Sequence, residues 1–317
     1  MRRRSQVVRQ RSAKPSSAGS IPAVASNIPL PPLFAFGQTV ESHGWYRLAP
    51  FRWSAEEGVL RRKEALPEGV VELAIEVRRG KLVVSGATPS EELTRRMTRM
   101  LQLDVDTSEF AALARESERH AWVAEAGFGR LLCGTTIWED AVKIIATTNT
   151  MWSQTVRMAE LLVAKCGRDG AFPTPREVVR FSEEELQRDC RLGYRAKSIH
   201  ALASRLVSGE LDLEALGDRT QPTATLFRNY QTLPGIGPYG AAHLLAMDGR
   251  HDFIAVDSEF RRFVRETYHR GRRVSDAAML RRYNKWGRWK YLAYWSELWS
   301  EAGVEFVAKE PVPAPAK

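Results

Sequence analysis

Two glycines and one aspartate, separated by an apolar segment, carry the clearest chemical signal in this sequence. The segment LPGIGPYGAAHLLAMDGRHDFIAVDSEF covers residues 233–260, with Gly235 and Gly237 near its start and Asp257 near its end. Glycine permits backbone angles and close approaches that a Cβ atom would prevent, and Pro238 suits the first turn of a helix. Successive backbone N–H groups at a helix start bind phosphate. The residues therefore predict a phosphate-binding turn followed by a carboxylate.

Asp257 precedes a second helical segment, SEFRRFV, in which Phe260, Phe263 and Val264 form one apolar face. Aspartate commonly caps a helix by accepting its first free N–H groups, so a purely structural role is one interpretation. The helix terminus would also keep the carboxylate ionised. An ionised carboxylate near a bound phosphodiester suits the cleavage of a glycosidic bond. Both interpretations place Asp257 at the start of a helix.

The chain is basic, and its excess charge is concentrated in two places. Among 317 residues, 47 are Lys or Arg and 38 are Asp or Glu, which gives a net charge of +9. Residues 1–14 contain six basic residues and no acid, and residues 257–290 contain eleven basic residues and four acids. Basic patches of this kind attract polyanions. We expect phosphate contact in the second patch, and a solvated basic helix surface is the alternative.

The cysteines and the apolar segments indicate a cellular compartment. Cys133, Cys166 and Cys190 are odd in number and lack metal-ligand spacing, so we expect reduced, structural thiols. No apolar segment approaches the ~18 residues that a membrane span needs, and the N-terminus lacks the apolar part of a signal peptide. We therefore expect a soluble, cytoplasmic protein, associated with the nucleoid if it is bacterial.

The composition divides the chain into four parts. Residues 1–33 are rich in Arg, Ser and Pro, as is typical of a disordered basic tail. Residues 34–110 are β-rich, and the sequence VVELAIEVRRGKLVVSG at 70–86 predicts a hairpin. Residues 111–305 have mainly helical spacing, and residues 306–317 are expected to form a second disordered tail. The fold class is therefore α+β, mostly helical with a small N-terminal antiparallel sheet.

Several finer expectations follow from the local pattern. The aromatic segment WYRLAPFRW at 45–53 is expected to contribute strand and packing. No internal repeat is visible. Helical spacing predicts helices near residues 90–102, 108–125, 137–147, 154–166, 183–189 and 196–207.

The segments described above resemble the helix-hairpin-helix (HhH-GPD) superfamily of base-excision DNA glycosylases. The glycine hairpin and the segment IAVDSEFRRFV are similar to the family signature, and residues 129–167 and 191–203 resemble its 8-oxoguanine and alkylpurine branches. The resemblance implies a mostly α-helical HhH-GPD fold with a small N-terminal antiparallel sheet. It also implies a double-stranded DNA partner, a damaged base that is flipped out of the stack, and hydrolysis of its N-glycosidic bond.

The family pattern assigns roles to the residues of the signature. Asp257 would be the catalytic carboxylate, which stabilises positive charge on the deoxyribose. Backbone amides of Gly235, Gly237 and Gly240 would bind DNA phosphate. The matching positions for a monovalent cation, Na⁺ or K⁺, that relatives hold through hairpin carbonyls are Gln231, Leu233 and Ile236.

A second group of residues matches the part of the family that enters the DNA duplex. Tyr194 matches the wedge tyrosine of the 8-oxoguanine branch, and Arg195 matches the neighbour that contacts the orphaned base. Asn149 matches the asparagine that fills the void. Gln154 stands where that branch has an arginine that reads the opposite cytosine, so the opposite-base preference stays open.

The expected base pocket departs from the bifunctional relatives at one position. Those relatives place a nucleophilic lysine where this chain has Tyr239, and a phenol cannot form the Schiff base that permits strand cleavage. The alkylpurine branch has an aromatic residue there, so Tyr239 is expected to line the base pocket. The segment WGRWKYLAYWSELW at 286–299 resembles the helix that closes the alkylpurine pocket, and we expect Trp289 or Trp295 to touch the base. His243 is expected to serve packing.

The family resemblance predicts a monofunctional glycosylase without strong AP-lyase activity, acting on a damaged purine in base-excision repair. The aromatic residues favour an alkylated base such as 3-methyladenine, whereas Asn149 and Tyr194 favour 8-oxoguanine. A non-catalytic DNA-binding protein is the alternative from another class. No required cofactor and no iron-sulfur cluster are expected, because no cysteine follows Cys190. We expect a monomer.

Overall fold

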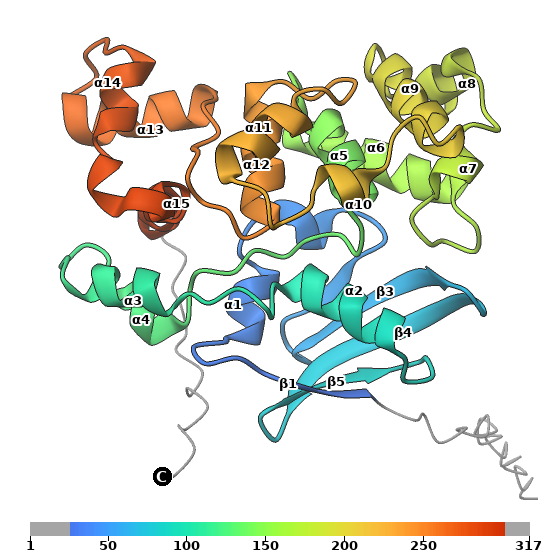
Figure 1. Cartoon of the computed structure of the whole chain (residues 1–317), viewed down its shortest axis with the longest axis horizontal. Helices are drawn as coiled ribbons and strands as arrows, with labels where there is room; N and C mark the ends of the chain where they lie inside the picture. Colours follow the sequence, from blue (N-terminus) through green and yellow to red (C-terminus); the bar gives the residue numbers. More distant parts are fainter. Residues whose placement is uncertain (1–25, 302–317) are drawn as a thin grey trace, which may run out of the picture.

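The computed structural model describes residues 26–301, and in this range a five-stranded antiparallel sheet lies beside a larger set of helices (Figure 1). The strand order is β1-β5-β4-β3-β2. The strands are β1 (Ser26–Pro29), β2 (Arg52–Ser54), β3 (Val59–Leu66), β4 (Gly69–Arg78) and β5 (Lys81–Ser85). The predicted hairpin is confirmed, because β4 and β5 are joined by Arg79 and Gly80, with φ angles of 51° and 71°. Positive φ at both residues matches the twist of a tight antiparallel hairpin.

The N-terminal end of the sheet corrects the predicted boundary of the basic tail. Strand β1 lies inside residues 1–33, where no strand was expected, and Ser26 pairs with Val84 of β5. Ile28 is buried in the core. The strand β1 has only four residues, and its pairing partner lies almost sixty positions away in the sequence. The local sequence therefore contains little that predicts it. Residues 1–25 and the predicted tail 306–317 lie outside the described residues.

The helices account for most of the described chain, and none of those within residues 26–301 is long and apolar enough to cross a membrane. Two short 3₁₀ helices are η1 (Gly44–Arg47) and η2 (Asn284–Trp289). The α-helices are α1 (Phe36–Val40), α2 (Glu91–Leu101), α3 (Ser108–Arg115), α4 (Trp122–Ala126), α5 (Ile137–Thr147), α6 (Trp152–Cys166), α7 (Pro175–Val178), α8 (Glu183–Asp189), α9 (Arg195–Val207), α10 (Leu213–Leu216), α11 (Thr223–Tyr230), α12 (Pro238–Met247), α13 (Ser258–His269), α14 (Asp276–Arg281) and α15 (Lys290–Glu301).

Two local predictions need correction. The segment at 45–53 forms η1 and then β2 instead of one strand, and it buries Trp45 and Phe51. The helix expected at 108–125 is interrupted between α3 and α4 by a turn in which the Ser117 hydroxyl contacts His120 Nδ1 at 2.8 Å. Serine side chains that bond to neighbouring groups compete with helix propagation. The other four helices expected after residue 130, and the one near 90–102, are present within about two residues.

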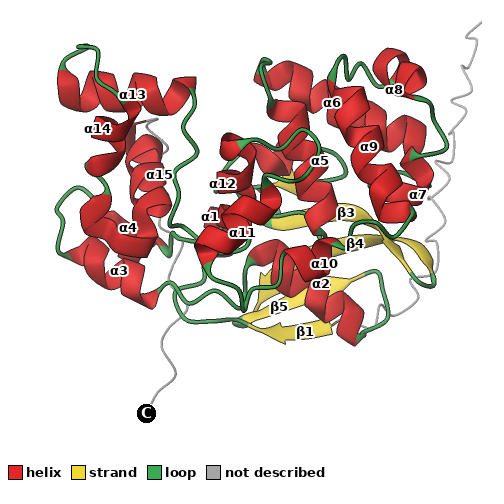
Figure 2. Ribbon diagram, turned by 45° about the horizontal axis from the view of Figure 1, so that its top comes forward, coloured by secondary structure: helices red, strands yellow, loops and turns green. Residues whose placement is uncertain are grey.

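The helix α12 contributes residues to two hydrophobic cores. Figure 2 shows α12 between α13 and α15 on one side and α5 and α9 on the other. The first core joins the sheet to α2, α5, α6 and α9, and α12 contributes Leu244 and Leu245 to it. The second core joins α3, α4, α13 and α15, and α12 contributes Ala242 and Ala246 to it. The helix α5 is buried on nearly every side, and its buried residues include the charged side chains of Glu139, Asp140 and Lys143. The residues at the start of α12 are therefore fixed from both sides.

Candidate active site

Asp257 opens helix α13 and is held there by the backbone. Its side-chain Oδ1 accepts a hydrogen bond from the Phe260 N–H at 2.7 Å, which is the expected capping contact. The carboxylate is half-buried. Burial raises the pKa of Asp257 above its ordinary value, and this effect outweighs the Phe260 N–H, which lowers it. The helix start was expected to favour the ionised acid, and its N–H groups do lower the pKa, but burial has the larger effect.

Aromatic side chains from two helices surround this carboxylate. Burial raises the pKa of Tyr239 on α12, and the negative charge of Asp257 adds to the rise. Burial also raises the pKa values of Tyr291 and Tyr294 on α15, and Asp257 again contributes. All three phenols therefore remain neutral and lie within electrostatic reach of the carboxylate. Two charged side chains of α13 also lie within electrostatic reach of Asp257: Arg261 lowers its pKa and Glu259 raises it.

The aromatic group continues one helical turn along α12 and α15. The ring of His243 meets Tyr239 edge to face at 4.5 Å between centroids, and it also meets Tyr291 at 6.0 Å. Burial lowers the pKa of His243 to about 4, so the ring is uncharged at neutral pH. Trp295 stacks on Tyr291 with 5.7 Å between ring centroids and an angle of 13°. His243 thus belongs to the aromatic group around Asp257, although a packing role was expected for it.

The two tryptophans that were expected in the base pocket have different environments. Trp295 is half-buried, and its Nε1–H donates to the Ser42 carbonyl at 2.8 Å. Trp289 is only 3% exposed and lies in the second core, with its ring near Phe110 and His251. The assignment of Trp289 to the pocket is therefore wrong. Gly287, inside η2, has a φ of 53° and interrupts the helical geometry two residues before Trp289.

The predicted phosphate-binding turn joins α11 to α12. The Leu233 carbonyl accepts the Ile236 N–H at 3.0 Å, and Gly235 has a φ of 79°. A proline followed by a glycine with positive φ is the composition of a type II turn. Gly235 and Gly237 are exposed, and within residues 26–301 their N–H groups donate no hydrogen bond. Free donors at the start of α12 are suited to bind an anion.

The remaining residues assigned to the hairpin have more varied surroundings. Gly240 is buried, and a Cβ atom there would lie 3.1 Å from Ile144 of α5, so the absence of a side chain allows close helix packing. Phosphate contact by its N–H stays a prediction. Among the carbonyls proposed for a cation, that of Leu233 already accepts the Ile236 N–H. A carbonyl oxygen has a second lone pair, so these residues are compatible with a cation, which also stays a prediction.

The residues expected to enter the duplex are brought together, as predicted. The Tyr194 hydroxyl contacts Asn149 Nδ2 and Thr148 Oγ1, both at 3.3 Å, and the Tyr194 side chain is 62% exposed. Arg195 differs from the expectation, because it is only 7% exposed. Its guanidinium donates to the carbonyls of Thr148 and Asn149. In this conformation Arg195 holds the backbone instead of presenting its charge to a base. Gln154 is exposed on α6.

The basic segment at 257–290 is partly neutralised on its own surface. Arg261 pairs with Asp276, Arg262 pairs with Glu259 and Glu266, and Arg288 pairs with Glu109. Exposed ion pairs of this type contribute little stability. They do reduce the charge that the segment offers to a polyanion.

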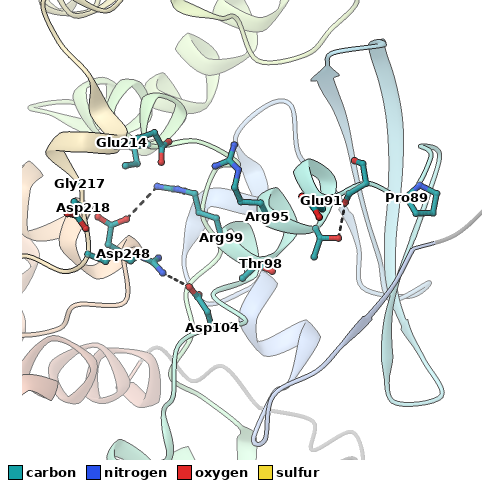
Figure 3. A pocket seen from close by; sticks show the side chains of 14 residues that line it. Pro89, Glu91, Arg95, Thr98, Arg99, Asp104, Glu214, Gly217, Asp218 and Asp248 are labelled. Carbon is teal, nitrogen blue, oxygen red and sulfur yellow. Dashed lines mark hydrogen bonds and ion pairs between the residues drawn. The ribbon is translucent and has the colours of Figure 1, made fainter.

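A cleft of about 850 Å³ lies elsewhere, between α2 and the segment after α10 (Figure 3). Arg99 and Asp248 face each other in it, with 3.9 Å between Nη2 and Oδ1, and Arg219 pairs with Asp104. None of the residues that line this cleft belongs to the aromatic group around Asp257. We therefore place the candidate active site at Asp257.

Sequence reasoning missed the contribution of the N-terminal part of the chain. Ser42 accepts the Trp295 N–H, and the neighbouring His43 lies within electrostatic reach of His243. Burial lowers the pKa of His43 to about 3. The spacing of Tyr291 and Trp295, four residues apart on one helix face, could have indicated their stack. No local signal indicates a contact between residues that are about 250 positions apart.

Comparison with known proteins matches one family model to part of the chain. Residues 142–288 match the model of the HhH-GPD superfamily, described as base excision DNA repair proteins. The match contains the hairpin, Asp257 and the duplex-entering residues, and it ends at η2. No sequence among the curated proteins matches the chain.

Solved structures with similar folds cover most of the chain. A 3-methyladenine DNA glycosylase from Archaeoglobus fulgidus is 19% identical, covers 87% of this chain and 98% of its own, and has a TM-score of 0.70. An 8-oxoguanine glycosylase/lyase from Clostridium acetobutylicum, bound to DNA with cytosine opposite 8-oxoguanine, is 20% identical, covers 82% and 92%, and has a TM-score of 0.64. The structure of MBOgg1 with a low-affinity DNA ligand is 22% identical, covers 88% and 96%, and has a TM-score of 0.69. At these identities the comparisons establish the fold, which is the α+β fold expected from the sequence.

Proposed function

We propose that this protein is a monofunctional DNA glycosylase that hydrolyses the N-glycosidic bond of a damaged purine in base-excision repair. The observation that carries the proposal is the position of Asp257, a half-buried carboxylate at a helix start, surrounded by neutral aromatic rings. Arg261 also lies within electrostatic reach of Asp257, but its effect on the pKa is smaller than that of burial, which raises it. The partner is double-stranded DNA that contains a damaged base.

The geometry suggests how the reaction would proceed. The free N–H groups of Gly235 and Gly237 hold a phosphate of the damaged strand, and the flipped base enters the aromatic group on α12 and α15. As the bond between base and sugar breaks, positive charge develops on the deoxyribose. The Asp257 carboxylate stabilises this charge, and water then attacks the anomeric carbon.

The side chain at position 239 supports a hydrolytic reaction without strand cleavage. Tyr239 directly follows the first residue of α12 and lies within electrostatic reach of Asp257. A phenol cannot form a Schiff base with the sugar, whereas an amine in this place could. We expect borohydride to trap no covalent adduct between the enzyme and DNA. A robust adduct would refute the monofunctional assignment.

The aromatic composition favours an alkylated purine as the substrate. Trp295 and Tyr291 offer stacked rings, which attract an electron-poor or cationic base. His243 is uncharged, since burial lowers its pKa to about 4, so it does not repel a cationic base. The contact between Tyr194 and Asn149 favours 8-oxoguanine instead, because both residues match that branch of the family. We favour alkylated adenine or guanine.

A panel of duplexes tests the proposal. Each labelled duplex carries one lesion, such as 3-methyladenine, 7-methylguanine or 8-oxoguanine, and alkali reveals abasic sites after incubation. We expect base release from at least one alkylated purine, with strand breaks only after alkali. Binding without release from any lesion would make the protein a non-catalytic DNA-binding module. Release of 8-oxoguanine alone would reverse the substrate preference.

A further inference from the structure

Two of the three cysteines lie in contact and form what we call the cysteine pair. Cys166 is the last residue of α6 and Cys190 directly follows α8, and their Sγ atoms are 3.8 Å apart. Figures 1 and 2 both show α6, α8 and α9 in one part of the molecule. Both side chains are free thiols. A disulfide has about 2.05 Å between its sulfur atoms, so the pair is one small movement away from a covalent bond.

The third cysteine has a different environment. Cys133 is fully buried, and its Sγ contacts the carbonyls of Leu131 and Met247, both at 3.3 Å. The cysteine pair is also buried, but Lys165 and Arg191, which are adjacent to its two members in the sequence, are exposed. The pair therefore lies just beneath the surface, and the reactivity of a thiol increases with its access to solvent.

The two thiols of the pair are not equivalent. The neighbouring Cys166 thiol lowers the pKa of Cys190, burial raises it, and the net direction is down. The charge of Lys165 also favours the Cys190 thiolate. The pKa of Cys166 is raised by the Cys190 sulfur and by burial. Since the thiolate is the nucleophile and a neighbouring thiol resolves its oxidised form, Cys190 is suited to attack an oxidant and Cys166 to close the disulfide.

The connection from α8 to α9 links Cys190 to Tyr194. Arg191 and Gly193 in this connection have φ angles of 55° and 57°. Left-handed backbone is uncommon for a residue such as arginine, so the connection is held in one specific conformation. A displacement of Cys190 is therefore passed on to Tyr194, which is expected to enter the DNA duplex.

The end of α6 is less able to move. A Cβ atom at Gly167 would clash with the carbonyl oxygens of Val163 and Ala171. The Gly167 N–H also bonds to the Val163 carbonyl at 3.1 Å. Because this end of α6 is closely packed, the approach of the two sulfur atoms has to be made mainly from the side of Cys190.

We propose that Cys166 and Cys190 are a modification site, at which a hydroperoxide produces a reversible disulfide that displaces Tyr194 and weakens the binding of damaged duplex DNA. Formation of the disulfide does not depend on the proposed function. Its effect on DNA binding rests on that function, since it assumes that the surface around Tyr194 binds damaged DNA.

The oxidation proceeds in two balanced steps. The Cys190 thiolate attacks one peroxide oxygen and the O–O bond breaks, which gives a sulfenic acid at Cys190, while the other oxygen takes up a proton and leaves as water or an alcohol. The Cys166 sulfur then attacks the sulfenic sulfur, the S–S bond forms, and the hydroxyl group leaves with the Cys166 proton as water. The two thiols lose two electrons in total, and the peroxide gains them.

The first test asks whether the bond forms. The reduced full-length protein is treated with hydrogen peroxide, the remaining thiols are alkylated, and peptides are mapped by mass spectrometry without reduction. The protein has three thiols, and we expect linked peptides of Cys166 and Cys190, with Cys133 alkylated. Dithiothreitol should restore all the thiols, and Cys166→Ser and Cys190→Ser should each yield no disulfide. Absence of the linked peptides in wild type, or Cys133 within the linked product, would overturn the inference.

The second test measures affinity for a duplex with a stable abasic analogue, so that it does not depend on base release. The oxidised protein should bind about ten-fold more weakly than the reduced protein, the order expected for loss of one aromatic stack on a base, and dithiothreitol should restore the affinity. Cys190→Ser lacks the attacking thiol, so peroxide should leave its affinity unchanged. Cys133→Ser is the matched control, because it keeps the cysteine pair and should respond to peroxide as wild type does.

Two binding results would also overturn the inference. One is an unchanged affinity in the fully oxidised protein, and the other is a response of Cys190→Ser equal to that of wild type. The lesion panel, run with reduced protein, tests the proposed function separately. If the reduced protein releases a base and oxidation leaves duplex affinity unchanged, the glycosylase assignment stands and the redox site falls. If oxidation weakens duplex binding through the pair but no base is released, the reverse holds.

Discussion

Two acidic side chains, the buried Glu139 and the half-buried Asp257, have different partners. Glu139 on α5 is buried and bonds to Arg62 at 3.0 Å and to Lys143 at 2.6 Å. Burial alone would raise the pKa of Glu139, but the two cations outweigh burial and lower it to about 2. Asp257 has a backbone N–H and neutral phenols instead, and burial raises its pKa.

The difference separates a structural carboxylate from a functional one. A buried charge is costly unless partners compensate it, and Glu139 has such partners on β3 and on its own helix. Ionised Glu139 stabilises the fold above the ordinary pKa of a glutamate, ~4.3, and this contribution is lost as the pH falls toward about 2. The contribution of Asp257 to stability depends on pH in the opposite direction. The fold favours its protonated form, so this contribution is lost as the pH rises through its raised pKa. An acid whose pKa is raised by burial, although backbone N–H groups and Arg261 favour its charged form, is a candidate for chemistry.

Asp257→Asn should have the largest effect on function and little effect on stability. Asparagine can still accept the Phe260 N–H and cap the helix, but it carries no charge. We expect single-turnover base release to fall by about 10³-fold or more, as for the loss of an electrostatic transition-state contact, with duplex affinity within a few-fold. The free energy of unfolding should stay equal or rise slightly, because a half-buried charge is removed. Near-normal turnover in Asp257→Asn would contradict a catalytic role for this carboxylate.

Glu139→Gln is the matched change at the structural acid. It leaves the buried Lys143 without its anionic partner and leaves Arg62 with Glu64 alone. Breaking a buried ion pair on one side costs about 3–5 kcal/mol, so urea denaturation should show a loss of this order. Base release per folded molecule should change little. Retention of full stability would show that the buried network around α5 is not what offsets the charge of Glu139.

Trp295→Ala and Trp289→Phe sharpen the contrast between the pocket and the core. Trp295→Ala removes the ring that stacks on Tyr291. This change should lower kcat/KM for a cationic alkylated base by about three- to thirty-fold, the range of a cation–π contact. The effect on a neutral lesion should be smaller. Trp289 lies in the second core, so Trp289→Phe should lower the unfolding midpoint and leave the preference among lesions unchanged. A changed preference in Trp289→Phe would contradict its placement in the core.

The sequence allowed the signature of the site to be predicted because its parts are local. Gly235, Gly237 and Pro238 indicate the backbone geometry of the turn through their residue types. Asp257 is at a helix start that the sequence also predicts. Asn149 and Tyr194 were each recognised by a local motif of one family pattern. These features depend on positions within one turn or one helix.

The remaining features depend on tertiary contacts that local patterns do not encode. Arg195 is buried because carbonyls of a distant turn accept its guanidinium. Trp289 was assigned to the pocket, but its ring packs near Phe110 and His251 in the second core, and these contacts come from distant parts of the chain. The helix start of Asp257 indicated only the backbone N–H that lowers its pKa, and the burial that raises it comes from the tertiary fold.

The pH dependence of single-turnover base release tests the central claim most directly. If the reacting group is the ionised Asp257, the rate should fall on acidification, with a midpoint above the ordinary ~3.9 of an aspartate, because burial raises its pKa. Enzyme-free duplex at each pH corrects for spontaneous depurination, and circular dichroism confirms that the protein stays folded. A rate that stays constant down to the pH of unfolding, or a midpoint below that of a free aspartate, would contradict the account.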